Sequence, residues 1–356
     1  MARHANFPTM PSDLPASPLR LSIDTAALVA NWRALDRLSG AARAGAAVKA
    51  DGYGLGARRV AKALHEAGCV DFFVAHWGEA AELLGTIPPQ SIAVLHGPPC
   101  VADAAYARAN GLRPVINSLH QALLWQEVGG GLCHLMVDTG INRLGLPMDE
   151  LGDPIVDGLQ IDMLLSHLAS AEEDSPQNAQ QCARWNAARG QVAHARASLA
   201  NSAGIALGPD YHGDLTRPGI ALYGGVPCAA LTPHIRQVAR PEAQLIQIRE
   251  LQAGDSVGYN GTFTAGAAMR VGVVSLGYAD GYLRCWSGKG VMLADGARLP
   301  VLGCISMDMT VIDLAAAPHL AEGDWVELDY TLPAAAAVSG LSQYELLTTL
   351  GRRFPR

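Results

Sequence analysis

The sequence predicts an α/β protein in which an N-terminal (β/α)8 barrel is followed by a C-terminal all-β domain. Three observations support this prediction. Short apolar runs alternate with segments of helical periodicity over about the first 240 residues. Eight of these runs have the length and composition of buried strands. After residue 240 the pattern changes to alternating apolar and polar residues separated by glycine-containing turns, which is typical of antiparallel strands.

The predicted barrel strands are 44–50, 71–76, 92–97, 112–118, 133–139, 161–167, 197–202 and 213–217. A helix over 24–38 precedes them, and helices over 57–67, 78–84, 101–110, 119–128 and 178–195 are predicted between them. An open doubly wound sheet has the same local pattern. The barrel is favoured because Lys49, His167, Asn201 and Arg217 all lie at the carboxyl ends of predicted strands, where barrel enzymes build their sites.

A chain of 356 residues is long enough for two domains. Residues 1–20 are rich in proline and are predicted to form an N-terminal arm. Residues 21–240 are predicted to form the barrel and residues 241–356 the β domain, with the boundary in the proline-containing and charged segment 232–241. In the β domain, strands are predicted over 244–251, 270–276 and 325–328, and a closing helix over 342–350.

Composition narrows the class of function. Hydrophobic residues make up 49% of the chain and charged residues 17%, which indicates a folded globular protein. A net charge of −7 gives no attraction to nucleic acid or to acidic membranes, so a small-molecule substrate is expected. The seven cysteines are dispersed without a C-x-x-C pair, and there is no apolar run long enough to span a bilayer. We therefore expect a cytoplasmic protein with buried, free thiols.

Lysine is rare in this sequence, because only Lys49, Lys62 and Lys289 occur among 26 basic residues. Lys49 lies in the last positions of the predicted strand 44–50 and precedes a glycine-rich segment. Burial lowers the pKa of an ammonium group, which can make a lysine a nucleophile or a Schiff-base former. A lysine that extends from the barrel rim into solvent fits this fragment equally well. Lys62 and Lys289 are predicted to be solvated.

The segment around Pro218 and Gly219 suggests a second feature. A helix beginning near Ile220 would present free backbone N–H groups as a seat for phosphate, with the Ser202 hydroxyl from the preceding strand beside it. Barrels often bind phosphate after their seventh and eighth strands. An ordinary strand-to-helix turn explains the same residues equally well.

Seven motifs occur in the order expected for one enzyme family. They are Val48–Gly54, Asp138–Gly145, Ser166–Ala169, Asn201–Ala203, Arg217–Gly224, Gly277–Gly281 and Ser306–Met309. Together they resemble the motifs of alanine racemases, pyridoxal-phosphate enzymes with a barrel and a β domain. The resemblance runs from about residue 21 to the C-terminus. It implies an isomerase that interconverts L-alanine and D-alanine, either for peptidoglycan precursors or in D-alanine catabolism.

The resemblance also implies a two-base mechanism. Lys49 would form the internal aldimine with pyridoxal 5'-phosphate and then act as one base on the external aldimine of the substrate. Tyr278 would be the other base, supplied by the second subunit of a homodimer. Arg143 would help to hold the substrate carboxylate or the phenolate oxygen of the cofactor, and Met307 would lie near the substrate pocket of the partner. Nothing in the resemblance implies a metal ion.

The cofactor would be held by positions that match the family motifs. These are Lys49, Tyr53, His167, Asn201, Ser202, Arg217, Gly219, Ile220 and Tyr344. Arg217 would hydrogen-bond the pyridine nitrogen, with His167 packed beside it. A permanently cationic donor there keeps the nitrogen unprotonated and disfavours transamination.

Two positions depart from the family pattern. Met136 stands where many relatives carry a lysine, so Arg143 must be positioned in another way, and Leu55 stands where a histidine is common. Substrate range therefore stays open, and a racemase acting on serine or other small amino acids shares every motif. Barrel-type pyridoxal-phosphate decarboxylases share Lys49 but do not need the Tyr278 motif. Single-domain cofactor carriers lack a β domain.

Overall fold

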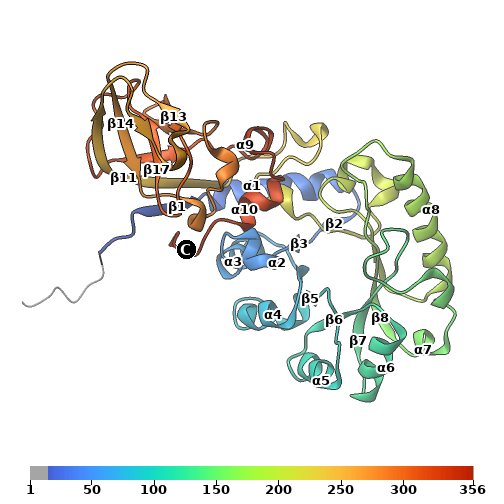
Figure 1. Cartoon of the computed structure of the whole chain (residues 1–356). Coiled ribbons are helices and arrows are strands. Elements are labelled where there is room, and N and C mark those ends of the chain that lie inside the picture. Colours follow the sequence, from blue (N-terminus) through green and yellow to red (C-terminus); the bar gives the residue numbers. More distant parts are fainter. Residues whose placement is uncertain (1–14, 356) are drawn as a thin grey trace, which may run out of the picture. The chain divides into compact units, whose positions relative to one another are not determined.

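The computed structural model describes residues 15–355 (Figure 1). Most of the predicted N-terminal arm, residues 1–14, lies outside the described residues. The described chain forms two compact units. The barrel unit comprises Ser22–Arg240 and Asp329–Leu350, and the β unit comprises the described residues up to Leu21 together with Pro241–Leu328 and Gly351–Pro355.

The barrel unit contains the predicted parallel strands. Seven of them form one sheet in chain order: β3 (Ala46–Ala47), β4 (Phe72–Val74), β5 (Ile92–Val94), β6 (Arg113–Ile116), β7 (Leu132–Met136), β8 (Gln160–Leu165) and β9 (Arg196–Ser198). The eighth predicted strand is β10 (Leu215–Thr216). It runs parallel to β2 (Arg43–Ala44), a short strand that directly precedes β3. Backbone N–H groups of Gly45 and Arg217 bond Thr216 at 2.9 Å and Ala200 at 2.8 Å, which closes the ring. The predicted (β/α)8 barrel is confirmed.

The helices of the barrel lie outside its strands (Figure 1). They are α1 (Thr25–Leu38), α3 (Ala57–Glu66), α4 (Trp77–Leu83), α5 (Val101–Ala109), α6 (Leu119–Glu127) and α8 (Pro176–Gln191), with the short helices α2 (Lys49–Tyr53) and α7 (Pro154–Asp157). Helix α1 begins where the Asp24 carboxylate accepts the Ala27 N–H at 2.8 Å. Leu28, Trp32 and Leu35 form its buried face, at the predicted helical spacing.

Several predicted strands extend too far toward their carboxyl ends. The strand predicted over 44–50 ends at Ala47, so Lys49 lies in the following turn and not in the strand. The strand predicted over 197–202 ends at Ser198, before Asn201 and Ser202. The helix predicted from Ile220 is a single 3-10 turn over Ile220–Tyr223. At the first two places the turn after the strand contains buried apolar residues, Val48 and Leu199–Ala200, that look like a continued strand.

The β unit consists of antiparallel strands arranged as a closed sheet. The order is β11 (Ala239–Leu251), β14 (Met269–Val274), β17 (Thr310–Asp313), β16 (Ala297–Leu302), β15 (Val291–Ala294) and β18 (Trp325–Leu328), and β18 pairs back with β11. Strand β1 (Leu19–Ile23) joins the other edge of β11. Buried and less buried residues alternate along β15, β17 and β18, as predicted for this part of the chain. The all-β fold of this region is confirmed.

The segment Asp329–Leu350 was predicted to belong to the β domain, but it packs with the barrel unit. It contains α9 (Leu332–Ser339) and α10 (Gln343–Thr348), which begins at the capping box of Ser342 and Glu345. The side-chain amide of Gln343 accepts from Val226 N–H at 2.8 Å and donates to the Val226 carbonyl at 2.9 Å. These bonds join positions 117 residues apart, a pairing that local sequence patterns do not encode. The other predicted domain limits stay predictions.

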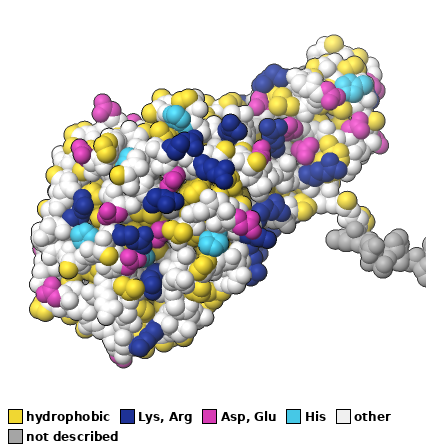
Figure 2. Space-filling model, turned by 180° about the vertical axis from the view of Figure 1, so that it is seen from behind, with side chains coloured by type: hydrophobic (Ala, Val, Ile, Leu, Met, Phe, Trp, Pro, Cys, Tyr) yellow, Lys and Arg dark blue, Asp and Glu magenta, His cyan; other side chains and the backbone are white. Residues whose placement is uncertain are grey.

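The seven cysteines are free, and their predicted burial holds for only some of them. Cys69, Cys133 and Cys182 are buried, whereas Cys100 is exposed. Basic and acidic side chains are interspersed on the face of the molecule in Figure 2. Within residues 15–355, no helix combines the length and the apolar character that crossing a membrane requires.

A partly buried ion-pair cluster joins the amino-terminal ends of the barrel strands. The Arg196 guanidinium binds both oxygens of Asp71 at 3.0 Å and both oxygens of Asp162, at 2.8 and 3.3 Å. His134 is fully enclosed beside them, with its Nδ1 atom 3.8 Å from an Asp162 oxygen and without a hydrogen-bond partner. Burial lowers the pKa of His134 to about 4. This histidine is therefore neutral in the folded protein at neutral pH.

The His134→Leu variant should lose part of the acid sensitivity of the fold. Between pH 6.5 and 4 the unfolded chain binds a proton at His134 that the folded chain does not, so unfolding becomes easier as pH falls, by at most about 3 kcal/mol. Urea unfolding midpoints measured at pH 6.5, 5.5 and 4.5 should therefore fall less steeply in the variant. An unchanged slope would contradict this assignment. The exposed His120→Gln variant is the control, and it should keep the wild-type slope.

Candidate active site

A cavity of about 880 Å³ follows the carboxyl ends of the barrel strands. All of the predicted site residues of the barrel unit line it: Lys49, Tyr53, Arg143, His167, Asn201, Ser202, Arg217, Gly219, Ile220 and Tyr344. Tyr278 and Met307, the remaining predicted residues, lie in the β unit. The structure therefore brings residues from the ends of five strands and from α10 to one place, at the end of the barrel where catalytic groups are usually found.

Lys49 lies two residues beyond β3 and leads into a left-handed turn. Ala50 and Asp51 both have φ of 53° and Gly52 has φ of 62°, and Tyr53 continues the left-handed conformation with φ of 55°. This conformation costs a residue other than glycine about 1–2 kcal/mol. Burial lowers the pKa of Lys49, and repulsion from Arg143 lowers it further. A partly buried lysine with a lowered pKa fits the nucleophile better than the solvent-exposed rim lysine that the sequence also allowed.

The turn after Lys49 delivers Tyr53 into an aromatic row. The buried ring of Tyr53 stacks on Tyr223 with centroids 4.6 Å apart and lies 6.3 Å from the ring of Tyr344. The Tyr223 hydroxyl donates to the Ala47 carbonyl at 2.8 Å, and the Tyr344 hydroxyl donates to Glu172 at 2.7 Å. Burial raises the pKa of Tyr53, so its hydroxyl stays protonated and available as a donor.

Next to Tyr53 is the segment that was considered as a phosphate seat. The Ser202 hydroxyl accepts from Gly219 N–H at 2.9 Å and from Ala221 N–H at 3.3 Å. A Cβ atom on Gly219 would overlap the Tyr53 hydroxyl, so glycine is required here. Asn201 Oδ1 accepts from the Gly204 N–H at 2.9 Å and so caps the turn after β9. Hydroxyl and amide groups thus converge on one part of the cavity wall.

Arg217 is buried and keeps its charge among neutral acceptors. Its guanidinium donates to the Ser198 hydroxyl and to the carbonyls of Ser166 and Leu199. Burial lowers its pKa to about 10, which still leaves it cationic at neutral pH. Within the described chain, no carboxylate forms an ion pair with this guanidinium.

His167 lies next to three cationic side chains. Burial lowers its pKa to about 3, and Arg217, Arg143 and Lys49 all lower it further. The imidazole is therefore neutral at neutral pH. A neutral ring among cations concentrates positive charge in this part of the cavity, which suits an anionic ligand, while Glu172 and Glu173 line another part of its wall.

The loop that carries Arg143 is held by its own backbone contacts. Met136, the last residue of β7, is buried in the cavity wall, as expected for a position without the lysine common in relatives. The Asp138 carboxylate accepts from the next loop amides, those of Gly140, Ile141 and Asn142, at 2.8, 3.0 and 3.2 Å. Leu55, the other departure, is fully buried and does not line the cavity.

Tyr278 and Met307 lie together in the β unit. The Tyr278 N–H donates to the Ser306 carbonyl at 3.0 Å, and the Ala279 N–H donates to the Met307 carbonyl at 3.0 Å. The buried Asp280 carboxylate accepts from the Gly277 N–H at 2.9 Å and fixes this turn. Tyr278 is partly buried, whereas Met307 is 52% exposed. Two motifs that are separate in the sequence therefore form one surface feature.

Helix α8 supplies side-chain amides that the sequence analysis did not identify. Gln181 is buried and donates to the His167 carbonyl at 2.9 Å and to the Thr139 hydroxyl at 3.3 Å, while it accepts from Ala169 N–H at 2.8 Å. One turn earlier, Asn178 donates to two carbonyls of the same loop at 3.0 Å. The signal that could have identified Gln181 in the sequence is a polar amide at a position of α8 that faces the core.

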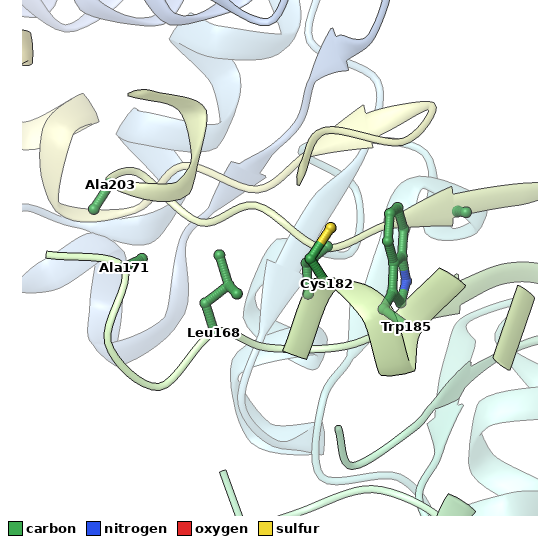
Figure 3. Close-up of a cluster of buried hydrophobic side chains, with 7 residues drawn as sticks. Leu168, Ala171, Cys182, Trp185 and Ala203 are labelled. Atoms are coloured by element: carbon green, nitrogen blue, oxygen red, sulfur yellow. The ribbon is translucent and has the colours of Figure 1, made fainter. Parts of the chain in front are cut away.

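The same helix packs apolar side chains against that loop. Figure 3 shows Cys182 and Trp185 of α8 in one buried cluster with Leu168, Ala171 and Ala203. Leu168 and Ala171 also line the cavity. The cavity wall after β8 is thus fixed by both hydrogen bonds and apolar packing from α8.

Comparison with known proteins supports the family that the motifs suggested. Residues 23–227 match the model of the alanine racemase N-terminal domain, and residues 238–356 match that of the alanine racemase C-terminal domain. The biosynthetic alanine racemase of Agrobacterium fabrum is 40% identical over 99% of this chain and 96% of its own length. The catabolic alanine racemase of the same organism is 41% identical, over 94% of this chain and 91% of its own.

The chain belongs to the alanine racemase family. Its fold is also that of solved alanine racemases. The crystal structure from Bartonella henselae, with covalently bound pyridoxal phosphate, has a TM-score of 0.88 and 37% identity over 96% of this chain and 99% of its own. That of the biosynthetic enzyme from Pseudomonas aeruginosa has a TM-score of 0.86 and 34% identity, with the same coverage of both chains. Alanine racemases are isomerases that depend on pyridoxal phosphate.

The cavity fits this cofactor of the alanine racemase family. Lys49 offers an amine with a lowered pKa to the aldehyde. Space beside the Tyr53 hydroxyl exists only because Gly219 has no Cβ atom, and Ser202 lies alongside. Arg217 is a buried cation without a protein counter-charge. Among residues 15–355, no group of three or more histidine, cysteine or acidic side chains is arranged to hold a metal ion.

Replacing Gln181 by Met should destabilise the barrel and loosen the cavity wall. Methionine keeps the shape but leaves buried polar groups of His167, Ala169 and Thr139 without their partner, at a cost of about 2–3 kcal/mol. Urea unfolding should show this loss, and hydrogen exchange should accelerate in the peptide that contains Ala169. The exposed Gln180→Met variant on the same helix is the matched control. Equal stability and exchange in both variants would show that these bonds contribute little.

Proposed function

We propose that this chain interconverts L-alanine and D-alanine, with pyridoxal phosphate held in the barrel cavity. The observation that carries the proposal is the convergence, at one end of the barrel, of an amine with a lowered pKa and an anion-binding wall. The Lys49 amine is the covalent attachment point. Tyr53, Ser202, Gly219, Ile220 and Tyr344 hold the phosphate, and Asn201 supports the same wall.

Racemisation requires proton transfer on both faces of the substrate α-carbon. When bound, the cofactor supplies an electron sink that acidifies the α-C–H bond. Lys49 removes or returns the proton on one face, and burial together with Arg143 lowers its pKa, which favours the free amine that acts as a base. Tyr278 performs the same task on the other face, so that removal by one residue and return by the other inverts the centre.

The cations of the cavity set the orientation of the reactants. Arg143, on the loop fixed by Asp138, binds the substrate carboxylate. Arg217 would donate to the pyridine nitrogen, and because its guanidinium stays charged, it would keep that nitrogen unprotonated. The neutral ring of His167 packs beside Arg217.

The second base is proposed to come from a partner subunit. Neither Tyr278 nor Met307 lines the barrel cavity, and Met307 is largely exposed. A homodimer in which each β unit presents this pair to the cavity of its partner would complete two equivalent sites, and a two-fold interface makes both contributions identical. The proposed location is the cytoplasm. Relatives named biosynthetic and catabolic are 40% and 41% identical, so identity favours neither role.

The direct test is to supply the purified protein with pyridoxal phosphate and either L-alanine or L-serine. We expect D-alanine to dominate, because the groups that crowd the α-carbon select small side chains. Chiral chromatography measures each D-enantiomer. Dominant D-serine would show a different substrate range, and release of carbon dioxide without racemisation would refute the proposed reaction.

Two inactive variants test whether the site is shared between subunits. Tyr278→Phe should lower kcat by about 10²–10⁴-fold while cofactor binding persists, because it removes one proton-transfer group. Lys49→Ala should lose the covalent attachment. After the two variants are mixed and exchange subunits, about a quarter of the wild-type activity should return, because half of the dimers are mixed and each has one intact site. No recovery despite demonstrated exchange would place both bases in one chain.

A further inference from the structure

A carboxylate outside the predicted site lies directly behind Lys49. Glu79 is the third residue of α4, and its side chain is 13% exposed. One oxygen accepts from the Ala50 N–H at 2.7 Å, and the other accepts from the Ala75 N–H at 2.7 Å. Ala50 follows Lys49, and Ala75 follows β4. A single side chain therefore joins the ends of two neighbouring strands.

The hydrogen bond to Ala50 holds a segment of backbone with strained, left-handed dihedral angles. Ala50 is the first residue of the left-handed turn, and the turn directs both the Lys49 side chain and Tyr53. A strained turn persists only where surrounding groups hold it in place. The Glu79 oxygen is the acceptor for the first amide of that turn, so it holds the turn at the point where Lys49 leaves the strand.

Helix capping alone does not explain these contacts. An acidic residue in the first turn of a helix usually interacts with its dipole or bonds the N-cap amide. Here the N-cap residue is His76, and neither Glu79 oxygen accepts from its amide. Both bonds go to amides outside α4.

The charge of Glu79 also faces the site. The charged and titratable groups that act on this pair are Arg143 and His167 around Lys49, and His76, whose Nε2 atom is 3.8 Å from Glu79 and whose ring lies 6.3 Å from that of His96. Burial and Arg143 lower the pKa of Lys49, and Glu79 opposes them by raising it. Glu79 is thus the acidic group that limits how far the Lys49 pKa falls.

We propose that Glu79 is a positioning residue for Lys49. Its carboxylate fixes the left-handed turn after Lys49 and places a negative charge beside the lysine. This inference rests on the proposed covalent role of Lys49. Two effects follow that can be separated. The geometry governs how fast Lys49 reacts once it is deprotonated, and the charge governs the pH at which it becomes deprotonated.

The experiment measures covalent attachment of pyridoxal phosphate to the full-length apoprotein. Absorbance gives the attachment rate from pH 6 to 10, and borohydride reduction with peptide mass spectrometry locates the adduct. In Glu79→Gln the midpoint of the pH profile should move to lower pH, and the limiting rate should fall about tenfold because the turn loosens. Glu82→Gln, an exposed change on the same helix, should leave both unchanged.

Glu79→Asp separates the two effects and serves if Glu79→Gln fails to fold. It keeps the charge but is one carbon shorter, so the midpoint should stay while the limiting rate falls. If a folded variant keeps both the wild-type midpoint and the wild-type rate, the proposal is overturned. A fall in thermal stability with unchanged attachment overturns it as well. If the wild-type protein forms no adduct at Lys49, the proposed function itself fails, which is distinguishable from a wild-type adduct unaffected by Glu79.

Discussion

The organisation of the barrel unit depends on which groups surround the charges of two arginines, one at each end of the strands. Arg196 is surrounded by the carboxylates of Asp71 and Asp162, so its charge is balanced within the protein. Arg217 is more deeply buried and is held only by a hydroxyl and two carbonyls. A buried charge without a counter-ion is costly, and such groups concentrate at functional sites. One end of the barrel is thus a structural ion-pair cluster, and the other is prepared for an anionic ligand.

The unbalanced charge of Arg217 extends to its neighbours. Burial keeps His167 neutral and Arg217 adds to this effect, while burial and Arg143 lower the pKa of the Lys49 amine and favour its free base. Arg143 lines the same cavity, so the positive charge that suits an anionic ligand also lowers the pKa of the Lys49 amine. Glu79 has the opposite effect, because its negative charge raises the pKa of Lys49.

Much of this arrangement could be predicted from the sequence. The alternation of apolar runs predicted the barrel, and the scarcity of lysine directed attention to Lys49. The residues that were missed, Ser198, Glu79 and Gln181, act on backbone groups or side chains of segments far away in the chain, and such pairings have no local pattern. For the same reason no local pattern predicted that the segment Asp329–Leu350 packs with the barrel unit, because its bonds to Val226 cross more than a hundred positions.

Arg143 can be held in place without the lysine that many relatives carry at the position of Met136. With the apolar Met136 in the wall, no described side chain hydrogen-bonds the Arg143 guanidinium. Its position comes from the backbone, because Asp138 holds three successive loop amides and the Gln181 amide holds Thr139 at the start of the same loop. Gln181 also holds the loop after β8, which carries His167. A single buried amide on α8 therefore holds the loop that carries Arg143 in register with the loop that carries His167.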